Sequence, residues 1–191
     1  MGMFTRRIAQ LIMVTLCTIF VTSVLFAASP LVWEGEQVKG LSGRAFKIQK
    51  LTKDPTGKVS GNKVIGIEKV AKGQKVASDS AAYRVNIPAN GTYYLWARLR
   101  WSNGCGNSFL MTISGIRGNW ILGGDGTYEA LHWLSLSDGG RPRALPLKKG
   151  VVTFTLGAKE SGAMADQFLL TTDRRYIPAG TYKATAKLLV M

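Results

Sequence analysis

Two alternating segments joined by a short turn constrain the fold of this chain more than any other feature of its sequence. In residues 83–87 apolar side chains alternate with Arg and Asn, and residues 93–99 repeat the pattern with larger side chains. This period of two is typical of a half-buried β-strand. The intervening Pro88-Ala89-Asn90-Gly91 predicts a turn, because proline cannot continue a ladder and Asn-Gly tolerates positive φ. We therefore expect an antiparallel hairpin that needs a second layer to cover it, as in a β-sandwich.

Similar short segments recur along the chain, spaced by about 8–12 residues and separated by glycine-rich turns. Outside the N-terminus no apolar periodicity of usable helical length is present. The sequence therefore predicts an all-β fold, a two-sheet antiparallel β-sandwich (jelly roll) over residues 31–191, preceded by one N-terminal apolar helix. The remaining expected strands are residues 31–36, 45–51, 64–70, 108–114, 119–122, 130–136, 151–156, 165–171 and 182–191.

The N-terminus combines a short basic segment with a long uncharged one. Arg6 and Arg7 precede 26 consecutive residues, 8–33, without a charged side chain. A secretory signal has a shorter apolar region of about 7–15 residues and small residues at its cleavage site. A membrane-spanning helix needs roughly 20 apolar residues, and Trp33 sits where an interfacial aromatic would lie. We favour a membrane anchor within residues 1–30, with a signal peptide as the alternative; both place the β-domain in the periplasm or at the cell surface.

The charge balance favours anionic partners. Lys and Arg number 25 against 11 Asp and Glu, and residues 39–75 contain ten basic and two acidic side chains. Such a surface suits acidic glycans, lipid headgroups or an acidic protein face, although lysines also protect edge strands from pairing with other chains. Nucleic acid is not an expected partner, because the domain is predicted to be exported and no recognised nucleic-acid-binding module is present.

Catalytic motifs are absent from the sequence. There is one histidine, His132, which excludes multi-histidine metal sites, and no serine or cysteine nucleophile motif accompanies it. No pair of acids has a spacing that recommends it as a glycosidase couple. The two cysteines, Cys17 and Cys105, provide no disulfide framework. We expect the protein not to be an enzyme.

Several segments together resemble the galactose-binding-like jelly-roll carbohydrate-binding modules of families 6 and 35. The resemblance spans residues 33–180, and its motifs follow the same order and spacing as in that family. It implies a jelly-roll fold and a sugar-binding ancestry. The matching segments are Trp33-Glu34-Gly35-Glu36, Ser60-Gly61, residues 83–99, Asn107-Ser108-Phe109, Leu147-Lys148-Lys149-Gly150, residues 165–171 and residues 174–180.

The same resemblance implies a structural calcium ion held by Glu34, Glu36 and Asp166. In the family the opening glutamates and the aspartate of the last strand lie side by side around the metal. Calcium prefers several carboxylate and carbonyl oxygens, so acids from the two chain ends would close the sandwich. Gly35 and Gln167 depart from the family pattern. Surface acids at strand ends are the alternative.

The sugar cleft implied by the resemblance is only partly present. Lys63 and Val64 stand where the family has an aromatic side chain, and Ala163 and Met164 stand where it has an asparagine. Trp133 lies within a strand pattern, so core packing is an alternative role for it. The candidate carbohydrate-binding residues that remain are Trp101, Asn107, Trp120, Tyr128 and Trp133.

Two functional hypotheses follow from these features. The first is a membrane-anchored accessory or scaffold subunit that docks on a larger membrane or envelope protein assembly. The second is a secreted or envelope protein that binds an acidic polysaccharide. A self-assembling surface filament, built by strand addition through the C-terminal strand, is a further alternative.

Overall fold

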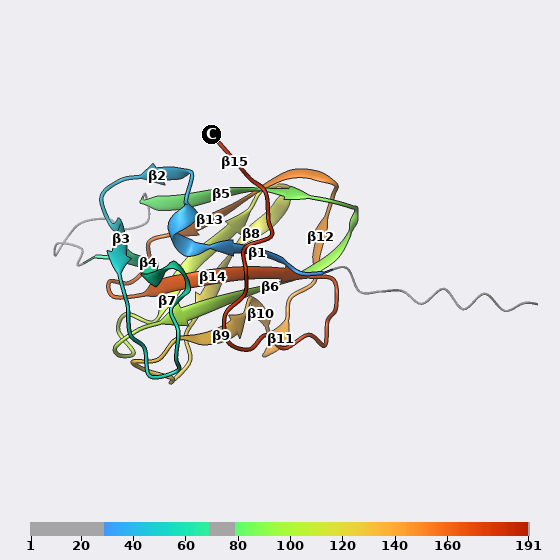
Figure 1. Ribbon diagram of the computed structural model, residues 1–191. Coiled ribbons are helices and arrows are strands. Elements are labelled where there is room, and N and C mark those ends of the chain that lie inside the picture. Colours follow the sequence, from blue (N-terminus) through green and yellow to red (C-terminus); the bar gives the residue numbers. More distant parts are fainter. Residues whose placement is uncertain (1–28, 69–78, 191) are drawn as a thin grey trace, which may run out of the picture.

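Two antiparallel β-sheets packed face to face form the described part of the chain. A computed structural model describes residues 29–68 and 79–190 (Figure 1). In these ranges the structure confirms the predicted all-β, two-sheet sandwich. The predicted N-terminal helix and most of the predicted membrane segment lie outside the described residues. No helix within the described ranges is long and apolar enough to cross a membrane.

The first sheet contains the first strand of the sandwich, β1. Its strands run in the order β12-β6-β14-β4-β3, with β1 also paired to β14 and β9 to β6. Strand β14 pairs with β6, β4 and β1, so it holds the sheet together. The strands are β1 (Leu31–Glu34), β3 (Phe46–Lys50), β4 (Lys63–Ile67), β6 (Gly91–Arg100), β9 (His132–Ser135), β12 (Leu145–Leu147) and β14 (Met164–Thr171).

The second sheet packs against the first across the core. Its strands run in the order β15-β5-β13-β7-β8, with β2 also paired to β5. The strands are β2 (Gly40–Ser42), β5 (Ser80–Ile87), β7 (Ser108–Ile113), β8 (Ile116–Gly123), β13 (Gly150–Gly157) and β15 (Leu188–Leu189). The remaining elements are a small hairpin of β10 (Ser137–Asp138) and β11 (Arg141–Pro142) and two 3-10 turns, η1 (Gly35–Gln37) and η2 (Ser60–Asn62).

The predicted hairpin of residues 83–99 is wrong, although both of its strands are present. β5 pairs with β13 and β6 pairs with β14, so the two strands lie in opposite sheets. Residues 88–90 therefore form an arch between the sheets, in which the Tyr93 hydroxyl donates to the Ala89 carbonyl at 2.9 Å. The arch lets the apolar faces of both strands point at each other across the core. A hairpin would have placed them side by side on one sheet.

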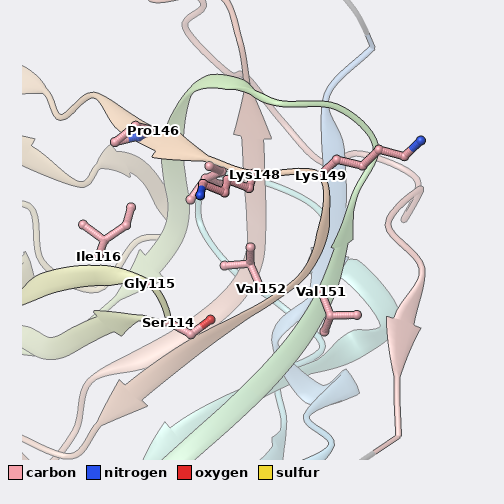
Figure 2. A pocket seen from close by; sticks show the side chains of 9 residues that line it. Ser114, Gly115, Ile116, Pro146, Lys148, Lys149, Val151 and Val152 are labelled. Atoms are coloured by element: carbon pink, nitrogen blue, oxygen red, sulfur yellow. The ribbon is translucent and has the colours of Figure 1, made fainter.

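A second arch, residues 148–149, connects β12 to β13 beside the first. The Lys149 amide donates to Asn90 Oδ1 at 2.8 Å, which ties the two arches together. We call this end of the sandwich, with the β7–β8 turn at residues 114–115, the arch end. It carries a surface hollow of about 330 Å³ (Figure 2).

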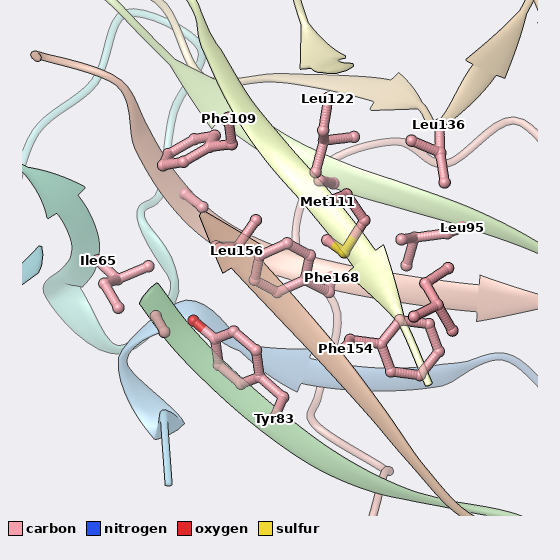
Figure 3. Close-up of a cluster of buried hydrophobic side chains, with 14 of the residues drawn as sticks. Ile65, Tyr83, Leu95, Phe109, Met111, Leu122, Leu136, Phe154, Leu156 and Phe168 are labelled. Atoms are coloured by element: carbon pink, nitrogen blue, oxygen red, sulfur yellow. The ribbon is translucent and has the colours of Figure 1, made fainter. Parts of the chain in front are cut away.

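Aromatic side chains from both sheets fill the core. Figure 3 shows Tyr83 and Phe154 of the second sheet facing Phe168 of the first. Trp33 lies among these three rings, fully buried, with its ring 5.4 Å from that of Phe168 and 5.3 Å from that of Phe154. Each fully buried large apolar side chain contributes about 1.5–3 kcal/mol. Trp33 is therefore a core residue of β1, and its expected role as an interfacial aromatic of a membrane helix is wrong.

The C-terminal strand expected at residues 182–191 is mostly irregular. In Figure 1 this segment, in dark red, crosses the face of the first sheet in front of β1, β14 and β6. The Tyr182 amide donates to Gln167 Oε1 at 3.0 Å, and the Thr185 amide donates to the Val32 carbonyl at 2.9 Å. Within residues 182–190 only Leu188–Leu189 form a strand, which pairs with β5. Crossing a sheet face prevents the segment from forming a ladder of its own.

Candidate functional site

The three predicted calcium ligands lie in one cluster at the junction of β1, η1 and β14. Glu34 ends β1 opposite Gln167 of β14, and Asp166 precedes that glutamine. Glu34 is 9% exposed and Asp166 is fully buried. Glu36 follows in η1, close enough that the charges of both other acids raise its pKa. The structure thus brings together the residues that the family resemblance named, and we call them the carboxylate cluster.

Both oxygens of Asp166 already accept hydrogen bonds. The Arg98 guanidinium donates to Oδ2 at 2.6 Å, and the Ser60 amide donates to Oδ1 at 3.0 Å. Arg98 is itself 2% exposed and also donates to the Lys58 carbonyl at 3.0 Å. The ion pair therefore joins β6, β14 and the loop before η2. Because both partners are buried, removal of either one leaves an uncompensated charge in the interior.

Glu34 and Glu36 are less completely satisfied. Glu34 Oε1 accepts a hydrogen bond from Gln167 Nε2 at 3.0 Å, but the Oε2 atoms of both glutamates are buried without a hydrogen-bond partner. Burial raises the pKa of Glu36 to about 7, and the neighbouring carboxylates add to this effect. Burial also raises the pKa of Asp166 to about 6, although Arg98 opposes it. The cluster therefore contains two buried carboxylate oxygens that no hydrogen bond within the protein stabilises.

The fit to calcium is partial. Two unpartnered carboxylate oxygens are donors that this hard cation prefers, so Glu34 and Glu36 suit it. Asp166 is engaged by Arg98 and Ser60. Within residues 29–68 and 79–190 no group of three or more His, Cys, Asp or Glu side chains is arranged to hold a metal ion. Calcium binding stays a prediction.

Four loops meet at the end of the sandwich opposite the arches, and we call this the loop end. Asp54 accepts a hydrogen bond from the Leu131 amide at 3.0 Å and pairs with Arg100 at 3.3 Å. The Asn107 amide donates to Glu160 Oε2 at 3.0 Å. These contacts tie the loops to one another and to the strands that carry them. The loops of the loop end are residues 51–59, 101–107, 124–131 and 158–163.

Tyr128 and Asn107, two of the predicted sugar-binding residues, lie together at the loop end. The Tyr128 side chain is 45% exposed. Its hydroxyl lies 3.2 Å from the position that a Cβ atom would take at Gly104, so the ring packs beside a turn that has no side chain there. Asn107 Nδ2 donates to the Asp125 carbonyl at 3.5 Å. The exposed ring of Tyr128 is thus available to a ligand.

Trp101 does not offer a ring face to a ligand, which corrects its expected role. It is 1% exposed, and the His132 ring meets it edge to face at 5.0 Å. His132 Nε2 in turn contacts Asp125 Oδ1 at 3.1 Å, and Nδ1 contacts the Ala130 carbonyl at 2.8 Å. Trp101 and His132 therefore support the loop of residues 124–131 from below. Their role is to hold Tyr128 and its loop in place.

The two other candidate tryptophans lie elsewhere. Trp120 is half-buried on β8, with the Arg143 guanidinium 4.9 Å above its ring in a cation–π contact. Trp133 is half-buried on β9, its indole nitrogen donates to the Gly180 carbonyl at 2.9 Å, and Tyr182 meets its ring at 5.7 Å. The C-terminal segment thus covers part of Trp133. The five predicted residues do not form one site.

Comparison with known proteins identifies the fold. No protein-family model and no curated protein matches the sequence. The carbohydrate-binding module CBM6cm-2 of lichenase 5A from Cellvibrio mixtus, in complex with cellotriose, matches with 20% identity and a TM-score of 0.51, over 74% of this chain and 96% of that chain. The C-terminal CBM6 of LamC from Zobellia galactanivorans matches with 14% identity and a TM-score of 0.53, over 74% of this chain and 98% of that chain.

A family 35 carbohydrate-binding module from Clostridium thermocellum matches with 15% identity and a TM-score of 0.50, over 75% of this chain and 98% of that chain. The fold is that of carbohydrate-binding modules of families 6 and 35. The resemblance inferred from the sequence motifs is confirmed at this level. At such identities the likeness to these modules is one of fold, and function depends on the site.

Arg98 is the residue in the carboxylate cluster that sequence reasoning missed. It occupies a polar-face position in the alternation of residues 93–99, which a strand usually presents to water. In this jelly roll the loop before η2 and the last strand cover that position. An arginine flanked by the apolar residues Ala97 and Leu99, with an aspartate on a later strand, is the only signal the sequence offered.

Proposed function

We propose that this chain is a non-catalytic carbohydrate-binding protein that binds a sugar chain at the loop end, against the exposed ring of Tyr128. Sugar rings present C–H patches that pack on aromatic faces, while amides and carbonyls bind their hydroxyls. Tyr128 provides such a face, and Asn107 lies in another loop of the same end, where its side chain contacts the Asp125 carbonyl of the Tyr128 loop. Loops held on a rigid sandwich are a common location for binding residues. The exposed ring of Tyr128 is the observation that carries the proposal.

Two acids at the loop end, Asp54 and Glu160, are poor candidates for the general acid of glycoside hydrolysis. Hydrolysis needs a carboxyl group with a raised pKa as the general acid. Burial favours a higher pKa for Asp54, but hydrogen bonds from Thr56 and Leu131 and the charge of Arg100 outweigh it and lower the pKa. For Glu160 burial is likewise outweighed, by Lys159 and two further hydrogen bonds, and its pKa is lowered. Both acids therefore stay ionised and act as structural acceptors.

The fold supports carbohydrate binding better than the accessory-subunit hypothesis that the sequence favoured. The Cellvibrio mixtus module is in complex with cellotriose, so a jelly roll of this kind binds a sugar chain in at least one neighbour. For the carboxylate cluster we propose a structural role, in which Glu34 and Glu36 bind calcium when it is present. Calcium there would neutralise the two unpartnered oxygens.

Affinity electrophoresis of the full-length chain through gels that contain neutral polysaccharides tests the proposal. The panel includes β-1,4-glucan, β-1,3-glucan and mannan. We expect retardation by at least one neutral polysaccharide and its loss in Tyr128→Ala, since removal of the ring removes the stacking surface. Tyr128→Phe is the matched variant, because it keeps the ring and removes only the hydroxyl, and it should retain most of the binding.

Thermal melting of each variant provides the folding control, because Tyr128 is a surface residue whose truncation should leave stability nearly unchanged. Equal retardation of wild type and Tyr128→Ala would show that the ligand binds elsewhere. Absence of retardation by every neutral polysaccharide would overturn the proposed function at this site.

A further inference from the structure

The hollow at the arch end has features of a second binding site, far along the strands from Tyr128. Strands β6 and β13 begin at the arch end and finish at the loop end, so the two sites lie at opposite ends of the sandwich. Ligand pockets have volumes of about 300–1,000 Å³, and this hollow of about 330 Å³ has room for a single sugar unit. It is lined by Ser114, Gly115, Ile116, Pro146, Leu147, Lys148, Lys149, Val151 and Val152.

Apolar side chains form part of the floor and walls of the hollow. Val152 is 7% exposed and forms part of the core beneath the hollow, whereas Val151 beside it is 45% exposed. Ile116 and Pro146 border the hollow on the other side in Figure 2. Such surfaces suit the C–H face of a sugar ring rather than a small, fully hydrated inorganic ion. A ligand that fits here carries an apolar face.

The backbone around the hollow is held by short hydrogen bonds. The Ser114 amide donates to the Thr153 carbonyl at 2.9 Å, and the Thr153 amide donates to Ser114 Oγ at 2.9 Å. The Ser114 hydroxyl accepts this bond and still has its own hydrogen to donate. The bond between the Lys149 amide and Asn90 holds the opposite wall. A hydroxyl donor is therefore fixed at the rim of the hollow before any ligand arrives.

The charge at the hollow is positive and unpaired. In Figure 2 the Lys148 side chain lies above Val152, whereas the Lys149 side chain extends away toward the right of the view. No acidic residue lines the hollow, and within residues 29–68 and 79–190 neither lysine forms an ion pair. One free ammonium group and one hydroxyl donor above an apolar floor match a ring that carries a single negative group.

We propose that this hollow is a binding site for the acidic group of a sugar residue, with Lys148 as the partner of its carboxylate or sulfate. The inference rests on the proposed function in one respect, that the ligand is a polysaccharide, but it uses different residues at the opposite end of the molecule. A uronic acid and a sulfated sugar share the chemistry that Lys148 recognises. The experiment below therefore includes both.

Binding of the full-length chain to oligogalacturonate, to sulfated dextran oligosaccharide and to neutral dextran, measured by isothermal titration calorimetry, tests the inference. We expect binding to at least one acidic ligand and none to neutral dextran. Lys148→Ala should weaken that binding about tenfold, the loss expected for one charge-assisted hydrogen bond. Lys47→Ala is the matched control, because it removes the same charge from an exposed residue of β3 that does not line the hollow, and it should change affinity by less than about twofold.

The pattern across the variants separates this site from the loop end. Tyr128→Ala should leave acidic binding unchanged, and Lys148→Ala should leave retardation by neutral polysaccharide unchanged. If Tyr128→Ala keeps its retardation by neutral polysaccharide while Lys148→Ala loses acidic binding, only the proposed function at the loop end is overturned. Equal losses in Lys148→Ala and Lys47→Ala would indicate diffuse attraction by a basic surface and overturn the inference, as would the absence of binding to both acidic ligands. If Lys148→Ala weakens binding to just one of the two acidic ligands, that ligand identifies the recognised group as a carboxylate or a sulfate.

Discussion

The Glu36→Gln substitution provides the sharpest test of the carboxylate cluster. Burial raises the pKa of Glu36 from 4.5 to about 7, with contributions from the charges of Glu34 and Asp166. In the unfolded chain the carboxyl ionises near its ordinary value. The folded state therefore keeps a proton that the unfolded state has lost as pH rises through this interval. Stability from this group is fully present below about pH 4.5 and is lost as pH rises through about 7.

The size of the effect follows from the pKa difference. Each pH unit between the two pKa values is worth about 1.4 kcal/mol, so the whole interval corresponds to about 3 kcal/mol. Part of the Glu36 side chain contacts water, which screens its charge, and we expect about half of this value. Asp166, with a pKa near 6, adds a smaller loss in the acid part of the same range.

Urea unfolding of the full-length chain in the presence of EDTA measures this loss. We expect the wild type to lose about 2 kcal/mol of unfolding free energy between about pH 5 and pH 8, and Glu36→Gln to lose less than half as much. The variant should also be the more stable protein at the upper pH, because glutamine carries no charge to bury. Glu68→Gln, which changes an exposed glutamate, is the matched control and should follow the wild type. A wild type that becomes more stable as pH rises, or a variant with the full wild-type slope, would refute the reasoning.

Three further predictions concern the same fold. Calcium in about hundredfold excess over its Kd should stabilise the wild type by about 2.7 kcal/mol and reduce the pH dependence of its unfolding free energy. It should stabilise Glu36→Gln less, and unchanged melting of the wild type with calcium would count against the metal site. Arg98→Ala should destabilise the protein by about 3–5 kcal/mol in urea, because it leaves Asp166 buried without its partner. Arg117→Ala, at an exposed position of β8, should have little effect, and similar values for the two variants would contradict a buried ion pair. Trp33→Ala should lower the unfolding free energy by about 3–5 kcal/mol through loss of core packing, and a change below about 1 kcal/mol would be incompatible with its burial between the sheets.

The carboxylate cluster shows which features of the site could be predicted from motif resemblance and which could not. Glu34 and Asp166 lie on neighbouring strands because β1 pairs directly with β14, and Glu36 follows in η1; that the three acids bind calcium stays a prediction. Their electrostatic state could not be predicted, since it depends on Arg98 and Ser60, which only the folded chain brings to Asp166. The exposure of the sugar-binding candidates could not be predicted either, because it also depends on the folded chain. Tyr128 stays exposed at the loop end, whereas Trp101 is buried beneath His132, and their sequence surroundings do not distinguish them.

Local alternation by itself determined where most strands lie, because a period of two in side-chain polarity reflects the geometry of the strand itself. Residues 83–87 and 93–99 are strands for that reason. Their partners were decided by tertiary structure: β5 and β6 bury their apolar faces against each other across the core, which a hairpin between them would not allow. The position of Lys148 over a hollow and of Tyr128 at the opposite end likewise follows from how the arches and loops are folded. Contacts between segments far apart in the chain depend on packing of the whole sandwich, and no local pattern encodes them.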